Sequence, residues 1–184
     1  MIDLVEQIKV NGFLLCPLKA TFENANMIYD IFAQDMQNLR FWIPNTDYKN
    51  PGDVFMVLKT RERSVKQCMY GIYKDKEFLG EIGITGYSDV NKYAIVGYWL
   101  KASARGFGTI NKVLPAIEKI AFQKMDINKL KLNCDVQNIA SRKIAEANGY
   151  KLDGIMRGDR VWPDGSVHDC CEYSKLRLEL AKGK

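Results

Sequence analysis

The chain has 184 residues, 47% of them hydrophobic and 27% charged, which fits one folded domain with a sizeable core. No run of about 18 apolar residues predicts a membrane-spanning helix, and the first ten residues carry acids and no apolar signal-peptide segment. The net charge of +5 is mild, and no basic stripe with interleaved aromatics accompanies it, so we expect no direct binding of nucleic acid.

Cysteine and histidine usage indicates a reducing compartment and no metal site. The cysteines are odd in number and none are spaced as C-x-x-C, which favours reduced thiols over a disulfide framework. They are Cys16, Cys68, Cys134, Cys170 and Cys171. With His168 as the only histidine, a zinc site is not expected. We therefore predict a cytoplasmic protein without a metal.

The first third of the chain predicts one strand and two helices. Phe13–Leu18 is apolar and ends near a proline, as a short strand does. Thr21 can cap a helix that extends to about Asn38, because apolar residues recur there at three- and four-residue steps. Pro51 suits the first turn of a second helix, which we expect to reach about Lys66.

The middle of the chain predicts three strands followed by a helix. Met69–Tyr73 and Phe78–Thr85 flank a polar turn and form a hairpin. Tyr93–Leu100 is rich in β-branched and aromatic residues, which is typical of a buried strand. An apolar helical face follows from Ile110 to about residue 125. Pro115 interrupts it and should kink the helix.

The last third predicts three more strands and a short helix. The strands are Lys129–Val136, Tyr150–Arg160 and Asp169–Leu178. Asn138 can cap the helix Ala140–Ala147. Together these elements indicate an α/β (α+β) fold in a single domain over residues 1–184, with a mixed, mostly antiparallel central sheet of six to seven strands flanked by helices.

The turn between the strand ending at Leu100 and the following helix has the character of an anion site. Gly106 and Gly108 have no Cβ, so a bulky anion can lie against the main chain at a helix N-terminus. Arg105 would add a fork of donors suited to phosphate. The sequence has neither the lysine of the P-loop nor the third glycine of G-x-G-x-x-G. A plain turn is therefore the alternative interpretation.

Three motifs in order carry a resemblance to a known family. Arg105-x-x-Gly108, after a Gly-Tyr-Trp-Leu strand, resembles the coenzyme A loop of the GNAT N-acetyltransferases, although Ile110 stands where glycine or alanine is usual. Asn138-x-x-Ser141, followed by Asn-Gly-Tyr, resembles the second family motif. The terminal strands also resemble those of the Rim-type branch, whose members acetylate N-terminal amines of ribosomal proteins.

The resemblance implies the GNAT fold and acetyl-CoA as the co-substrate. In that fold the strand with the Tyr-Trp-Leu sequence separates from its neighbour and binds pantetheine along the freed backbone. The implied coenzyme A site consists of Tyr98, Trp99, Leu100, Arg105, Gly106, Phe107, Gly108, Thr109, Ile110, Asn138 and Ser141. For Asn138, the alternative is a plain helix cap.

Acetyl transfer needs a neutral amine, a donor for the oxyanion and a proton for the leaving thiolate. Many family members use a tyrosine as the acid where Ala145 stands here, so the resemblance points to Ser141, whose alternative role is a helix-start serine. The usual carboxylate base is replaced by Ile95. Glu81 and Asp159 are substitutes, or structural and surface acids, in which case water would relay the proton.

The segment 39–50 is the expected acceptor site, with Phe41, Trp42 and Tyr48 as substrate-binding residues. Because Asp47 is its only acid, an N-terminal peptide amine is favoured over a polycation. A small amine, such as an aminoglycoside, polyamine or toxin, is the alternative acceptor. A catalytically weak acyl-CoA-binding regulatory module is a second alternative. We expect no membrane partner, and the sequence leaves a homodimer open.

Overall fold

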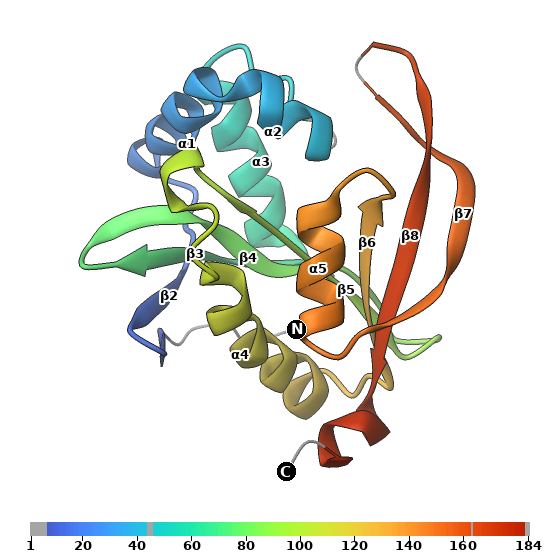
Figure 1. The fold of residues 1–184 in the computed structure, drawn as a ribbon. Coiled ribbons are helices and arrows are strands. Elements are labelled where there is room, and N and C mark those ends of the chain that lie inside the picture. Colours follow the sequence, from blue (N-terminus) through green and yellow to red (C-terminus); the bar gives the residue numbers. More distant parts are fainter. Residues whose placement is uncertain (1–6, 44–45, 163, 183–184) are drawn as a thin grey trace.

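The computed structural model describes residues 7–43, 46–162 and 164–182, and it arranges them around one sheet (Figure 1). The sheet has eight strands in the order β1-β2-β3-β4-β5-β6-β8-β7. Only the β5–β6 pair is parallel among the strands described. The strands are β1 (Ile8–Val10), β2 (Phe13–Pro17), β3 (Cys68–Lys74), β4 (Glu77–Ser88), β5 (Tyr93–Leu100), β6 (Lys129–Asp135), β7 (Lys151–Val161) and β8 (Val167–Leu176).

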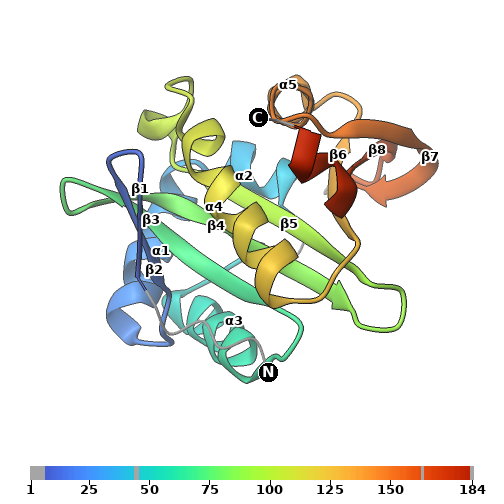
Figure 2. The same ribbon diagram turned by 90° about the horizontal axis from the view of Figure 1, so that it is seen from below.

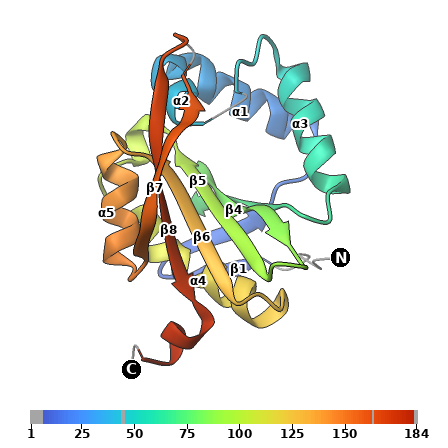
Figure 3. The same cartoon turned by 90° about the vertical axis from the view of Figure 1, so that its right-hand side faces the viewer.

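Helices cover both faces of this sheet. The helices are α1 (Phe22–Gln34), α2 (Met36–Trp42), α3 (Pro51–Arg63), α4 (Thr109–Lys124) and α5 (Ile139–Ala147), with short 3₁₀ segments at Ala102–Ala104 and Arg177–Lys182. Helices α1 and α3 pack on one face, and α4 and α5 pack on the other (Figure 3). The hairpins β1–β2 and β7–β8 lie at opposite edges of the sheet (Figure 2).

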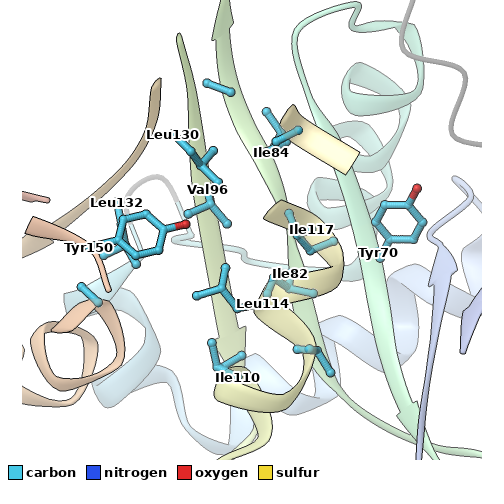
Figure 4. Packing of buried hydrophobic residues seen from close by; sticks show 14 of the residues in the cluster. Tyr70, Ile82, Ile84, Val96, Ile110, Leu114, Ile117, Leu130, Leu132 and Tyr150 are labelled. Atoms are coloured by element: carbon cyan, nitrogen blue, oxygen red, sulfur yellow. The ribbon is translucent and has the colours of Figure 1, made fainter. Parts of the chain in front are cut away.

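The core beneath α4 fixes the helix that follows the glycine loop. Ile110, Leu114 and Ile117 repeat at helical spacing and are almost fully buried. They lie against Val96 of β5 and Ile82 of β4 (Figure 4). Burying each such side chain contributes about 1.5–3 kcal/mol, so the start of α4 is held firmly against the sheet.

The core on the other face packs α1 and α3 against the sheet. Phe32 of α1 contacts the Trp99 ring edge-on, with 4.9 Å between centroids. Val54 and Leu58 of α3 are each only 1% exposed. Helix α3 begins at a complete capping box, in which the Asn50 side chain accepts from Gly52 N.

The structure differs from the prediction in one strand count and two helix boundaries. The sheet has one strand more than the predicted maximum of seven, because Ile8–Val10 is too short to give a pattern and joins the sheet through the turn at residues 11 and 12. The helix predicted from Thr21 to Asn38 divides at Asp35, which ends α1. The second helix ends at Arg63 rather than Lys66.

Pro115 does not end α4. The assigned helix continues from Thr109 to Lys124, and Pro115 lies on its exposed side. The carbonyl of Asn111, which loses its usual donor, therefore faces the solvent side of the helix, where water can replace the bond. None of the described helices is both long and apolar enough to cross a membrane.

Candidate active site

The loop between β5 and α4 has the open glycine geometry that the sequence predicts. Gly106 has φ of +83° and Gly108 has φ of +67°, a backbone region that strongly favours glycine. A Cβ built on either glycine would meet no atom within 4 Å, so the space in front of the loop is open. Gly108 is the N-cap residue of α4. A ligand can therefore approach the main chain at the start of this helix.

The N-terminus of α4 can bind an anion. No side chain caps it, and no acidic residue lies in its first turn. The first N–H groups of a helix have no partner within the helix, and the dipole of a 16-residue helix adds partial positive charge there. Thr109 and Ile110 are buried, which anchors this end. The geometry suits the pyrophosphate group that the sequence implies.

Arg105 is held by partners within the chain. Its Nε donates to the Leu100 carbonyl oxygen at 2.9 Å, and its Nη2 pairs with the Asp35 carboxylate at the end of α1. This arrangement ties the loop to β5 and to α1. The predicted phosphate fork is thus partly occupied by contacts that orient the loop.

Strands β5 and β6 separate, as the resemblance implies. Their parallel ladder pairs only Tyr93 with Lys129, Ala94 with Leu130 and Ile95 with Lys131. Beyond it, residues 96–100 and 132–135 continue as strand without pairing to each other, while β5 stays paired to β4 and β6 to β8 (Figure 3). The gap offers unpaired backbone groups on its edges, which can bind an extended chain such as pantetheine.

On the α4–α5 face, side chains of β5, β6 and α5 gather beside this gap. The Tyr98 hydroxyl is buried and makes no hydrogen bond within the described residues. Burial raises the pKa of Tyr98 well above its ordinary value, and the neighbouring Ser141 side chain opposes this shift. Cys134 is buried on β6, and its burial raises the pKa of the thiol to about 12. Because only the thiolate is nucleophilic, a thiol that stays protonated in this way is a poor nucleophile.

Ser141 lies in the first turn of α5. Its backbone N donates to Asn138 Oδ1 at 3.0 Å, so Asn138 is the predicted cap. The cap bond uses the Ser141 amide and not its hydroxyl, which remains beside Tyr98. Ala145 is fully buried on the same helix, so no tyrosine projects from that turn.

Glu81 is part of a buried ion pair. It is 1% exposed, and both carboxylate oxygens accept from Arg61 Nη1, at 3.0 and 3.2 Å. Trp99 Nε1 donates to the same carboxylate at 2.9 Å. With these donors in place, Glu81 joins α3 to β4 and β5, and the geometry favours the structural alternative over the role of base.

Asp159 is exposed on β7, in the stretch where pairing with β8 is irregular between Met156 and Arg160. The next residue, Arg160, donates to the Trp42 carbonyl oxygen at 3.2 Å, which brings this part of β7 to the end of α2. Asp159 therefore lies in the neighbourhood of the expected acceptor segment, where a carboxylate can draw a proton through water.

The three predicted acceptor residues differ in their surroundings. Trp42 is half-buried and packs edge-on against Trp162 of the β7–β8 hairpin, with 5.6 Å between centroids. Tyr48 is 7% exposed and packs against Phe32, so it belongs to the core between α1, α3 and the sheet, and its contact with a substrate stays a prediction. The Phe41 side chain lies outside the described part of the structure.

Sequence reasoning missed a polar cluster behind Trp42. His168 stacks on Trp162 at 3.7 Å, and its Nδ1 lies 3.4 Å from Asp135 Oδ2. Trp162 Nε1 donates to the same Asp135 oxygen at 2.8 Å, and Ser166 Oγ lies 3.0 Å from His168 Nε2. Within the local sequence, only the strand-like alternation of residues in the terminal hairpin points to this cluster, because Asp135 comes from a different strand.

Successive residues on β6 point to opposite faces of the sheet. Cys134 faces the core beneath α4, and Asp135 follows it, so its side chain points to the opposite face. The gap therefore has Tyr98 and Ser141 on one side and the Trp42 cluster (Trp42, Trp162, His168 and Asp135) on the other. Such a gap can bring a thioester and an amine together from opposite faces.

A comparison with known families agrees with this geometry. The model of the acetyltransferase (GNAT) domain matches residues 14–151. The chain belongs to the GNAT acetyltransferase family. The match includes the glycine loop, the β5–β6 gap and α5, and it ends as β7 begins. The protein is thus an acyltransferase of this family.

Curated GNAT relatives include two bacterial proteins. YdaF from Bacillus subtilis (strain 168), named provisionally as a ribosomal N-acetyltransferase, is 24% identical over 85% of this chain and 88% of its own length. The ribosomal-protein-serine acetyltransferase of Escherichia coli (strain K12) is 33% identical over 48% of this chain and 50% of its own length.

Solved structures share the GNAT fold closely. RimL, an α-N-acetyltransferase of ribosomal protein L7/L12 in complex with coenzyme A, has a TM-score of 0.85 at 22% identity, covering 93% of this chain and 98% of its own. The microcin C7 self-immunity acetyltransferase MccE, in complex with acetyl-CoA and AMP, has a TM-score of 0.79 at 20% identity, with 90% and 93% covered. At these identities the likeness concerns the fold.

Proposed function

We propose that this protein transfers the acetyl group of acetyl-CoA directly to the N-terminal α-amine of a protein, with ribosomal proteins as the substrate class. The observation that carries the proposal is the open β5–β6 gap beside the uncapped N-terminus of α4. We place the reaction in the cytoplasm and assign it to the chain as a single domain. The five cysteines are unpaired, in keeping with a reducing compartment.

Each part of the site fits one part of acetyl-CoA. The start of α4 and the loop at Gly106 and Gly108 would hold the pyrophosphate. The free edge of β5 would bind the pantetheine amides as a neighbouring strand would. Thioester and acceptor then meet where the ladder opens. Acetyl-CoA is a substrate in this proposal, and no covalent enzyme intermediate is required.

The chemistry that we propose assigns two roles. Ser141 supplies a hydroxyl near the leaving sulfur, since its cap contact uses only its amide. Water, drawn toward the exposed Asp159, removes the proton that the attacking amine loses. An α-amine has a pKa near 8, so a useful fraction is already neutral at cytoplasmic pH. A weak base in the site is therefore sufficient.

The acceptor assignment rests on the Trp42 cluster and on the relatives. Trp42, half-buried against Trp162, offers an aromatic surface beside the sheet, which suits a peptide main chain. Relatives named for ribosomal-protein acetylation support the same choice. MccE, a self-immunity enzyme of the same fold, marks the small-amine alternative.

An acetyl-CoA turnover screen tests the proposal. Coenzyme A release is measured with peptides that begin with serine or alanine, and with spermidine, kanamycin and amino acids as small amines. We expect turnover with the peptides. Efficient acetylation of a small amine without peptide activity would assign the acceptor to the other class. Acetyl-CoA binding without turnover on any amine would indicate the regulatory module.

A further inference from the structure

Two buried hydroxyls near the β5–β6 gap lack a hydrogen-bond partner among the residues that the structure describes. The phenolic oxygens of Tyr98 and Tyr150 are both buried, and neither makes a hydrogen bond within the described residues. Leaving such a group unpaired destabilises a protein by about 1–3 kcal/mol. Other buried polar groups, such as Glu81 and Asp135, have partners. An unpaired hydroxyl at this place therefore indicates that a bound ligand supplies its hydrogen-bond partner.

The position of Tyr98 identifies where that partner would be. Tyr98 stands on the part of β5 that has no β6 residue paired to it. It packs with the core beneath α4, while the adjacent Trp99 packs on the opposite face. Ser141 of α5 lies beside its hydroxyl, and Cys134 of β6 is close enough to affect its ionisation. The hydroxyl thus lies between β5, β6 and α5.

Tyr150 has different surroundings. Its hydroxyl is directed toward Val96 of β5 (Figure 4). Its ring lies 5.2 Å from Lys175 Nζ, and Lys175 forms a buried ion pair with Glu118 of α4 at 2.8 Å. Burial and, after it, the neighbouring Glu118 carboxylate raise the pKa of Tyr150, so this hydroxyl is beside that charged pair. Of the two phenols, Tyr98 is the one next to Ser141.

We propose that the Tyr98 hydroxyl donates a hydrogen bond to the sulfur of bound acetyl-CoA as it leaves as a thiolate. This inference rests on the proposed function and adds a second donor to Ser141. Helix α5 itself carries no tyrosine. The strand therefore supplies the phenol, from the side of the gap opposite β6.

The proton and electron balance of the step is simple. The amine nitrogen attacks the carbonyl carbon, a C–N bond forms, and the C–S bond breaks with its electron pair passing to sulfur. Tyr98 keeps its proton, because burial holds its pKa far above that of a thiol. It stabilises the thiolate by a charge-assisted hydrogen bond. The proton that the amine nitrogen loses neutralises the thiolate through Ser141 or water.

Tyr98→Phe tests the inference, because it removes only the hydroxyl. Since that hydroxyl has no hydrogen-bond partner in the described part of the chain, we expect an unchanged or higher melting temperature. We expect kcat to fall about 10- to 100-fold, the scale of one hydrogen bond to a charged group. Tyr150→Phe is the matched control and should change kcat less than about 3-fold, the low end of the effect of a neutral hydrogen bond.

A binding measurement separates contact with sulfur from shaping of the gap. Affinities for coenzyme A and for desulfo-coenzyme A, which lacks the sulfur, are measured by calorimetry, and the ionisation of the bound thiol is followed by thiolate absorbance. In Tyr98→Phe the pKa of the bound thiol should rise, while desulfo-coenzyme A binds as before. Unchanged kcat and thiol ionisation, or equal weakening of both ligands, overturns the inference. If the unmodified protein binds neither compound, the proposed function fails and the inference with it.

Discussion

Two adjacent residues of β5, Trp99 and Tyr98, show the difference between the two faces of the sheet. Trp99 points toward α1 and α3, donates to Glu81 and packs edge-on against Phe32 and Phe78. Tyr98 points the other way and its hydroxyl has no partner in the described structure. The contacts of Trp99 are complete within the described chain and stabilise the fold, whereas we propose that the Tyr98 hydroxyl finds its partner in a ligand.

The same difference extends along the strands. On the Trp99 face, the Arg61–Glu81 ion pair joins α3 to the sheet. On the Tyr98 face, the β5–β6 ladder stops at Ile95 and α4 begins without a side-chain cap. Substitutions that break the Arg61–Glu81–Trp99 contacts should therefore change stability, and those at groups that line the gap should change binding or turnover. Four predictions test this division.

The largest effect is expected at Gly108. In Gly108→Glu, a carboxylate at the start of α4 should oppose the pyrophosphate, and like charges in contact cost several kcal/mol. We expect coenzyme A affinity to fall about 1000-fold, as measured by calorimetry. Gly108→Asn is the control, because asparagine tolerates positive φ and adds no charge, and it should lose far less affinity. Unchanged affinity in a folded Gly108→Glu variant would remove the anion site.

The second prediction concerns Glu81. Glu81→Ala leaves Arg61 and Trp99 Nε1 without their acceptor, and breaking a buried pair costs about 3–5 kcal/mol. Arg61 is partly exposed, so we expect the low end, about 3 kcal/mol, in denaturant unfolding. Glu77→Ala on the same strand removes an exposed pair with Lys101 and should cost less than about 1 kcal/mol.

For Glu81→Ala, kcat per folded molecule should stay within about 3-fold of the original at a temperature well below unfolding. A loss of kcat larger than that of Tyr98→Phe, with stability unchanged, would reverse the assignment and make Glu81 the base. The control at Glu77 shows whether any charge change on β4 has the same effect.

Local sequence patterns predicted the elements that surround the proposed coenzyme A site. Strand β5, the glycine loop, the start of α4 and the Asn138 cap each depend on neighbouring residues, and the structure confirms them. The predicted separation of β5 from β6 came from the family resemblance and is confirmed by their short ladder.

Contacts between distant residues decided what the sequence did not predict. The break between α1 and α2 lies at Asp35, whose carboxylate pairs with Arg105, 70 positions away. Glu81 is occupied by Arg61, and His168 lies beside Asp135 only because β8 pairs with β6. No local periodicity encodes such pairs.

The third prediction concerns Ser141. Ser141→Ala keeps the amide bond to Asn138 and removes only the hydroxyl, so α5 should remain capped. We expect kcat to fall about 100-fold, the lower range of lost acid catalysis, with little change in acetyl-CoA affinity. Ser141→Thr retains a hydroxyl and should recover part of the rate. Undiminished turnover in the alanine variant would mean that Ser141 only stabilises the start of the helix. Water would then protonate the leaving thiolate.

The smallest effect is expected at Trp42, which lies on the proposed acceptor side. Trp42→Ala removes an aromatic surface that packs on Trp162, and loss of such an anchor costs about 1–2 kcal/mol of binding. The KM for a serine-initiated peptide should therefore rise about 10-fold, while the KM for acetyl-CoA stays within 2-fold, roughly the scatter expected of a distant site. Trp42→Phe keeps an aromatic ring, so its KM for the peptide should lie between those of the original protein and Trp42→Ala. Because acetyl-CoA would bind at the opposite side of the gap, equal rises in both KM values would mean that Trp42 supports the whole site rather than the acceptor.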